Sequence, residues 1–220
     1  MRSCWLNDCA NLGIDYKFFV GVGQGAEQFC DGISENVVAV ETGDDFVVLP
    51  RVPDDMAHLT LKTQDKLRWA LARGYSHCYC CFPDTYCRPE RLFDAPFAAF
   101  DYLGDFRSEC AQPDNFASGG PGYFLSRRTF SLLMDAPIEG VWRDDEHLKQ
   151  AEDLFVGQIL ARHYTALGLR YFDDQRFINH GRSRPGPLGT NDVISTHLSC
   201  PDPYTSDAML ATHKYWLESQ

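Results

Sequence analysis

Asp84 is the first residue in the sequence whose type and setting suggest chemistry. It follows the apolar run Cys78-Tyr79-Cys80-Cys81-Phe82, which has the length and aromatic content of a buried strand, and Pro83 ends that run. Because ligands of open α/β sheets bind outside the carboxyl ends of the strands, an acid at this position can hold a metal ion or a polar ligand. The alternative interpretation is that Asp84 caps a turn before the next helix.

Three later segments could contribute to the same site. In Ser118-Gly119-Gly120-Pro121-Gly122-Tyr123, closely spaced glycines let another molecule approach the backbone, or allow turns with positive φ. Glu152-Asp153 begins a predicted helix, where two acids could instead simply complement the helix dipole. His197 has the apolar neighbours Ile194 and Leu198, a setting in which a lone histidine is usually structural.

The composition limits the class of protein. The chain has 220 residues, 44% of them hydrophobic and 23% charged, which is typical of a soluble domain with one substantial core. The net charge of −11 argues against nucleic acid or an anionic membrane as the main partner, because both require a basic surface. No apolar run is long enough for a membrane span, and no signal-peptide core is present. The sequence therefore predicts a cytoplasmic protein, unless an N-terminal anchor has been removed.

The nine cysteines do not form an obvious framework. Their odd number and the crowding of Cys78, Cys80, Cys81 and Cys87 around one predicted strand make a poor disulfide pattern. The spacing C-x-C-C-x5-C is not a usual zinc-ligand spacing either. We therefore expect free thiols in a reducing compartment.

The elements that must position these side chains follow from the hydrophobic pattern. Strands are expected at 17–22, at 37–41 or 46–49, at 78–82, at 102–104 and at 169–172. Helices are expected from Asp54 to about Gly74, from Ser126 to Met134 and from Glu152 to Tyr164, with helical or irregular segments at 1–15, 89–100 and 209–217. Residues 179–193 have the composition of a loop. The strand–helix–strand order predicts an α/β fold with a mixed, mostly parallel sheet flanked by helices in a single domain, 1–220.

A second interpretation concerns Gly21-x-Gly23-x-Gly25, which follows a strand and precedes another strand that ends in an acid, Glu41. This arrangement is similar to a dinucleotide-binding fingerprint, but the spacing is G-x-G-x-G rather than G-x-G-x-x-G. Little room is left for a helix before the next strand. A glycine-rich turn is the favoured interpretation.

Taken in order, six segments resemble those of the inverting GT-A glycosyltransferases of the β-1,3-galactosyltransferase and Fringe type, family 31. The segments are Arg2-Ser3-Cys4-Trp5 (R-x-T-W in the family), Tyr16 to Gly21 (its second strand), Asp54 to Thr63 (D-x-Y-x-N-L-T-L-K-T), Pro83 to Leu92 (D-D-D-T-Y-V-R-P-E-x-L), Phe116 to Arg128 (Y-x-S-G-x-G-Y-x-L-S) and Glu152 to Leu160 (E-D-V-x-V-G-x-C-L). The resemblance covers nearly the whole chain.

The resemblance implies a fold, a reaction and a site. The fold would be a single GT-A domain, a Rossmann-like α/β domain, that transfers a sugar from a UDP-sugar to a hydroxyl of a glycan or glycoprotein acceptor. Asp84 and His197 would hold Mn²⁺ or Mg²⁺, and Asp153 would be the catalytic base. The donor would bind at Asp84, Lys62 and Arg2, and the acceptor at Gly119, Gly120 and Glu152. Trp142 could stack against a sugar face of the acceptor, or it could be a core tryptophan.

The sequence also departs from the family pattern. Phe82 and Pro83 replace the first two positions of the D-x-D motif, and the family's first strand should precede Arg2. These departures favour an alternative, a non-catalytic carbohydrate- or nucleotide-binding domain on the same fold. The family works in the Golgi lumen of animals and plants, so a cytoplasmic location would indicate a microbial or viral protein.

Overall fold

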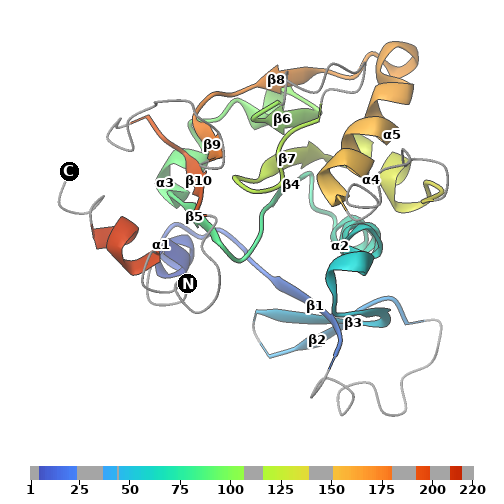
Figure 1. The fold of residues 1–220 in the computed structure, drawn as a ribbon, viewed down its shortest axis with the longest axis horizontal. Helices are drawn as coiled ribbons and strands as arrows, with labels where there is room; N and C mark the ends of the chain where they lie inside the picture. Colours follow the sequence, from blue (N-terminus) through green and yellow to red (C-terminus); the bar gives the residue numbers. More distant parts are fainter. Residues whose placement is uncertain are drawn as a thin grey trace. The chain divides into compact units, whose positions relative to one another are not determined.

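The computed structural model describes residues 5–23, 37–43, 45–106, 116–138, 151–179, 192–198 and 209–214. These residues form two compact units, traced in Figure 1. Unit 1 contains the described residues of 1–15, 79–125 and 169–220, and unit 2 contains those of 16–78 and 126–168. Each unit is therefore assembled from segments that are far apart in the sequence.

The chain combines helices and strands throughout, so the predicted α/β class is confirmed. In chain order the elements are α1 (Trp5–Asn11), β1 (Phe18–Val22), β2 (Val40–Thr42), β3 (Phe46–Pro53), the 3-10 helix η2 (Met56–His58), α2 (Leu59–Ala72), β4 (His77–Cys80), β5 (Thr85–Cys87), α3 (Pro89–Leu92), the 3-10 helix η3 (Phe97–Ala99), β6 (Tyr102–Gly104), β7 (Tyr123–Ser126), α4 (Arg127–Met134), α5 (Glu152–Leu167), β8 (Tyr171–Asp173), β9 (Phe177–Asn179) and β10 (Ser195–His197). Residues 209–214 are also helical.

Unit 2 contains a three-stranded sheet in the order β1-β3-β2, with β1 parallel and β2 antiparallel to β3. Its inward face carries Val47, Leu49 and Val52, which pack with Phe19 and Trp69. Helix α2 contacts α4 and α5. Burial of these apolar side chains is the main stabilising contribution in this unit.

Local signals explain where α2 begins and ends. The Asp55 carboxylate accepts a hydrogen bond from the backbone N–H of His58 and so caps η2, which leads into α2. A side-chain hydrogen bond from His58 lowers the pKa of Asp55. Gly74, with a φ of +82°, follows the last turn of α2, where glycine avoids the strain that a side chain would suffer. The helix predicted from Asp54 to Gly74 is thus confirmed, with a 3-10 turn at its start.

Gly21 has a structural role in unit 2. A Cβ at this position would lie 2.4 Å from the carbonyl oxygen of Val52 and 2.7 Å from that of Pro53. The glycine thus allows β1 and β3 to approach closely where their register shifts. Gly25, the last glycine of the possible fingerprint, lies outside the described residues.

Unit 1 contains the sheet β5-β10-β9 and most of the sheet β4-β7-β6-β8. Strand β10 is antiparallel to β5 and parallel to β9, and β6 is antiparallel to β7 and parallel to β8. The aromatic rings of Tyr102, Phe106, Tyr123 and Tyr171 pack on one another beside the second sheet. The sheets are mixed, as predicted, but they are not mostly parallel, because antiparallel pairs are as common as parallel ones among β1–β3, β2–β3, β5–β10, β9–β10, β6–β7 and β6–β8.

Some element predictions were wrong in detail. The strand predicted at 78–82 ends at Cys80, and it stands at the end of the strand order β4-β7-β6-β8. Strands β5, β7, β9 and β10 were not predicted, because three or four residues are too few to show the alternation that identifies a strand. Among the described residues, no helix is long and apolar enough to cross a membrane.

Candidate functional site

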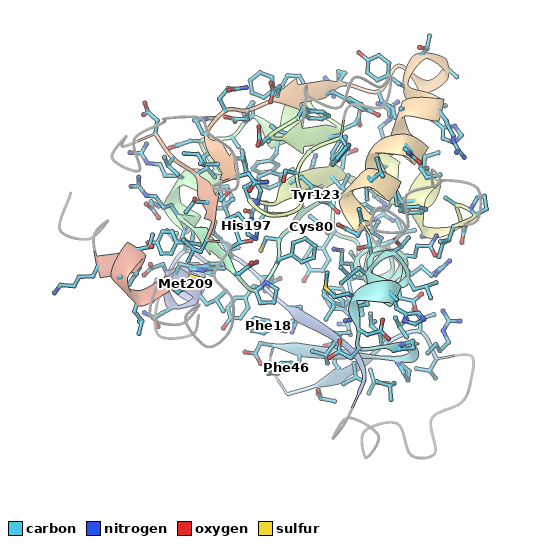
Figure 2. The ribbon with its side chains drawn as sticks, in the orientation of Figure 1. Phe18, Phe46, Cys80, Tyr123, His197 and Met209 are labelled. Atoms are coloured by element: carbon cyan, nitrogen blue, oxygen red, sulfur yellow. The ribbon has the colours of Figure 1, made fainter. Side chains whose placement is uncertain are left out.

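Strand pairing in unit 1 brings Asp84 and His197 together. Thr85 in β5 is the register partner of His197 in β10, and the N–H of Leu198 donates to the carbonyl oxygen of Asp84 at 3.0 Å. As a result, Nε2 of His197 lies 2.7 Å from Oδ2 of Asp84, although 113 residues separate them. Figure 2 labels His197 on β10.

This pair is partly open to solvent and could hold a divalent cation. The side chains are 29% exposed for Asp84 and 22% exposed for His197. A carboxylate oxygen and an imidazole nitrogen are ligands that suit Mn²⁺, and Mg²⁺ is often held by one or two carboxylates together with water and substrate phosphates. Within the described part of the chain, no group of three or more potential metal ligands occurs. Asp84 and His197 would thus supply two of the ligands of a cation bound here.

The second ring nitrogen of His197 faces Asn179. The Nδ1 atom lies 3.3 Å from Oδ1 of Asn179, whose Nδ2 donates to Oγ of Ser118 at 2.8 Å. Asn179 is the register partner of His197 in the parallel pair β9–β10, so the two side chains lie on the same face of the sheet. Ser118 is fully buried. A continuous polar chain thus runs from Ser118 through Asn179 and His197 to Asp84.

Hydroxyl groups hold the glycine-rich turn against this sheet face. Thr85 Oγ1 donates to the carbonyl oxygen of Gly120 at 2.6 Å, and Ser195 Oγ donates to that of Pro121 at 2.6 Å. The hydroxyl of Tyr79 donates to the same Pro121 oxygen at 2.5 Å, and burial raises the pKa of Tyr79. The turn is therefore fixed by side chains of three different segments.

Gly120 leaves space for the imidazole of His197. A Cβ on Gly120 would lie 2.6 Å from Nδ1 and 2.7 Å from Cγ of that ring. The sequence analysis assigned Gly119 and Gly120 to the acceptor sugar, on the reasoning that missing side chains make room for it. At Gly120 the room is used by His197, and the acceptor assignment stays a prediction.

The two acids that begin α5, in unit 2, have different surroundings. Glu152 is only 4% exposed; its Oε1 accepts from the Thr63 hydroxyl at 2.7 Å and lies 3.7 Å from Nζ of Lys66. Asp153 is half-buried, and its Oδ1 accepts from the N–H of Leu154 at 2.9 Å. Glu152 therefore connects α5 to α2, and its predicted acceptor contact stays a prediction.

The remaining predicted site residues are Lys62, Arg2 and Trp142. Lys62, 16% exposed at its side chain, forms an ion pair with Oδ1 of Asp54. That oxygen also accepts the backbone N–H of Gly21 at 3.1 Å, so the pair links α2 to β1 within unit 2. Arg2 and Trp142 lie outside the described residues.

Sequence reasoning missed Asn179, Thr85 and Ser195 as parts of the site. Ser195 and His197 are two residues apart, the spacing that places side chains on one face of a strand, and this signal was available. Asn179 was assigned to the start of a loop but ends β9. Its role depends on register with β10, which no local pattern reveals.

No protein-family model matches this sequence, and the comparison with curated proteins finds no match. A function must therefore be argued from the geometry of the site and from the sequence motifs.

Proposed function

We propose that this protein is an inverting glycosyltransferase that moves a sugar from a UDP-sugar to a hydroxyl of a glycan or glycoprotein acceptor, assisted by Mn²⁺ or Mg²⁺. One observation carries the proposal. The two residues that the family resemblance assigns to the metal ion, Asp84 and His197, lie with side-chain atoms 2.7 Å apart. They come from opposite parts of the chain, and both are accessible to a ligand.

The two side chains offer a suitable donor set for the cation. Asp84 would contribute Oδ2 and His197 would contribute Nε2, because the Nδ1 atom of the ring already faces Asn179. When bound, the cation supplies a positive charge that neutralises the charge on the departing diphosphate. The hydroxyl groups of Thr85 and Ser195 hold the backbone of Gly120 and Pro121 in place next to His197. The two proposed ligands are therefore preorganised.

Asp153 is the proposed base. As the acceptor hydroxyl attacks the anomeric carbon, the bond from that carbon to the diphosphate oxygen breaks and the hydroxyl proton passes to the base. Asp153 is half-buried in the first turn of α5, where a helix N-terminus stabilises a carboxylate. The role itself comes from the resemblance of Glu152 to Leu160 to the family's E-D-V segment.

The first test is calorimetric titration of UDP into metal-free protein, with and without Mn²⁺. We expect binding only with Mn²⁺, and loss of that binding in Asp84→Ala and His197→Ala. Asp15→Ala and His163→Ala, which make the same changes at exposed positions, should bind as the wild type does. UDP binding of equal strength without metal would contradict the assignment of Asp84 and His197.

Turnover is then measured with a panel of UDP-sugars and glycan acceptors, with the anomeric configuration of the product read by NMR. Inverted product supports the proposal. The replacement of two D-x-D positions by Phe82 and Pro83 favours the second candidate, a non-catalytic binding domain. Metal-dependent UDP binding without transfer to any acceptor in the panel would favour that candidate.

A further inference from the structure

We infer that Asn179 is a positioning residue, which holds the imidazole of His197 with its proton on Nδ1 and so leaves the Nε2 lone pair directed at the position of a metal ion beside Asp84. The metal ion rests on the proposed function above, whereas the position of the proton rests on the hydrogen bonds of unit 1. No sequence motif pointed to Asn179.

Backbone register is the first reason for this assignment. Ile178 and Asn179 in β9 are the register partners of Thr196 and His197 in β10. Paired residues of neighbouring strands place their side chains on the same face of a sheet, so Asn179 stands beside the ring of His197. The observed distance of 3.3 Å between Oδ1 and Nδ1 follows from this pairing.

The orientation of the Asn179 amide is the second reason. Its Nδ2 donates to Oγ of Ser118 at 2.8 Å, and Ser118 is fully buried on the glycine-rich turn. The N–H of Ser118 donates to the carbonyl oxygen of Asp105 at 2.8 Å, which fixes the serine in turn. With Nδ2 used in this way, Oδ1 is the atom that faces the ring. An amide oxygen only accepts hydrogen bonds, so in this arrangement the facing Nδ1 carries a proton.

The third reason is that a proton on Nδ1 leaves the other ring nitrogen, Nε2, as an acceptor. A neutral imidazole with a proton on Nδ1 has a bare Nε2, which is an acceptor and a metal ligand. This Nε2 lies 2.7 Å from Oδ2 of Asp84, which also accepts. Two acceptors at this distance repel unless a cation, either a proton or a metal ion, is shared between them. Asn179 therefore prepares the pair to receive a cation.

Gly120 prevents the ring from leaving this position. A Cβ there would lie 2.6 Å from Nδ1 and 2.7 Å from Cγ of His197, so the ring packs directly against the backbone of the turn. Thr85 fixes the carbonyl group of Gly120 by a hydrogen bond of 2.6 Å. The imidazole is thus held by Asn179 at its Nδ1 edge and by Gly120 beneath it. Residues that orient a metal-bound histidine in this way typically change metal affinity about 10- to 100-fold when they are replaced.

If the Asn179 amide were reversed, the ring proton of His197 would lie on the other nitrogen. The two orientations of the amide therefore differ in which ring nitrogen carries the proton, and this can be measured. If Nδ2 of Asn179 donated to Nδ1, the ring proton would reside on Nε2 and would form an ordinary hydrogen bond to Asp84. The histidine would then be a structural residue with no lone pair for a metal ion. The position of one proton therefore decides between a prepared ligand and a structural contact.

The test combines nitrogen-15 NMR of the histidine rings in metal-free protein with the affinity for Mn²⁺ alone, measured by electron paramagnetic resonance of free Mn²⁺. The His197 signals are identified by their loss in His197→Ala. We expect the wild type to carry a proton on Nδ1. Asn179→Leu replaces the side-chain amide, with its oxygen and its nitrogen, by an apolar side chain of similar size. It should move the proton to Nε2 and weaken Mn²⁺ binding about 10- to 100-fold.

Two further variants separate positioning from a general structural effect. Asn179→Asp keeps an accepting oxygen towards Nδ1, so it should retain the Nδ1 proton and bind Mn²⁺ at least as tightly as the wild type does. Asn11→Leu makes the same change as Asn179→Leu at an exposed site of unit 1 and should alter neither property. Thermal unfolding of each variant shows whether the fold is retained.

The outcomes distinguish this inference from the proposed function. A wild-type His197 with a proton on Nε2 and none on Nδ1 would overturn the positioning role of Asn179, even if Mn²⁺ and UDP bind as proposed. Unchanged Mn²⁺ affinity in Asn179→Leu would overturn it as well. Wild-type protein that has the Nδ1 proton but binds no Mn²⁺ would overturn the metal site and with it the proposed function, while the effect of Asn179 on the ring would stand.

Discussion

Two carboxylates, Glu152 in unit 2 and Asp84 in unit 1, make short contacts of similar length but differ in what surrounds them. Glu152 is almost fully buried, and its oxygen accepts from a hydroxyl and lies near an ammonium group, both of which are donors. Asp84 is about a quarter exposed, and its oxygen faces a ring nitrogen whose other side is turned to an accepting amide. A buried acid with donors around it fixes helices, whereas a partly open acceptor pair is suited to bind a cation.

The same contrast exists between neighbours in the sequence. Glu152 and Asp153 both begin α5, but Glu152 is buried against α2 and Asp153 is half-buried. Sequence reasoning treated both as site residues. Its surroundings indicate that Glu152 stabilises unit 2, whereas the role of Asp153 stays a proposal.

The largest expected effect is on turnover in Asp153→Asn. Loss of the proposed base should lower transfer about 100- to 10,000-fold, while UDP and Mn²⁺ binding stay within a few-fold of the wild type, because the amide cannot accept the proton. Initial rates and calorimetry measure the two quantities separately. Turnover equal to that of the wild type would remove Asp153 from the role of base.

The next effect is on stability, in Glu152→Ala. This change leaves the buried hydroxyl of Thr63 without its acceptor and Lys66 without its counter-ion, and should lower the free energy of unfolding by about 3 kcal/mol. Denaturant unfolding measures it. Asp84→Ala should cost about 1 kcal/mol or less, because Asp84 is partly solvated. An equal decrease in the free energy of unfolding for the two variants would contradict the distinction between Glu152 as a structural acid and Asp84 as a functional one.

A third effect combines stability and binding in Gly120→Ala. The added methyl group would lie 2.6 Å from Nδ1 of His197, so the ring must move, at a cost of about 2 kcal/mol and with loss of Mn²⁺ affinity. Gly13→Ala is the control in unit 1, because Gly13 has a φ of +68° but nothing within 4 Å of an added Cβ. It should cost about 1 kcal/mol through backbone strain and leave Mn²⁺ binding unchanged. Unchanged Mn²⁺ affinity in Gly120→Ala would show that ring position does not control the ligand pair.

The smallest effect concerns a buried thiol of unit 1. Burial, with a smaller contribution from Asp8, raises the pKa of Cys9 from 9.0 to about 12. Between these two pH values the folded protein keeps the thiol proton and the unfolded chain loses it, so the free energy of unfolding falls as pH rises through this window. Cys9→Ala should lack this part of the decline in unfolding scans at successive pH values. An identical decline in both proteins would show that Cys9 is not shielded as its 2% exposure indicates.

The longer elements could be predicted from the sequence because each carries its own periodic pattern. Helices α2, α4 and α5 and strand β1 lie close to their expected positions, and Gly74 marks the end of α2 as expected. In the described residues the five cysteines at 9, 78, 80, 81 and 87 are free thiols. The family resemblance assigned Asp84 and His197 to one site, and their side chains lie 2.7 Å apart, while the metal-binding role stays a proposal.

What the sequence determined by itself is therefore the set of long elements and the types of side chain available for chemistry, since both depend on neighbours within a few residues. Only the tertiary structure decided that β10 lies between β5 and β9, that Asn179 faces His197, that the ring of His197 packs against Gly120, and that Glu152 is buried. Each of these facts depends on the register of three-residue strands or on contacts between distant segments. Short strands have no distinctive pattern, and their pairing is selected by the packing of the whole unit.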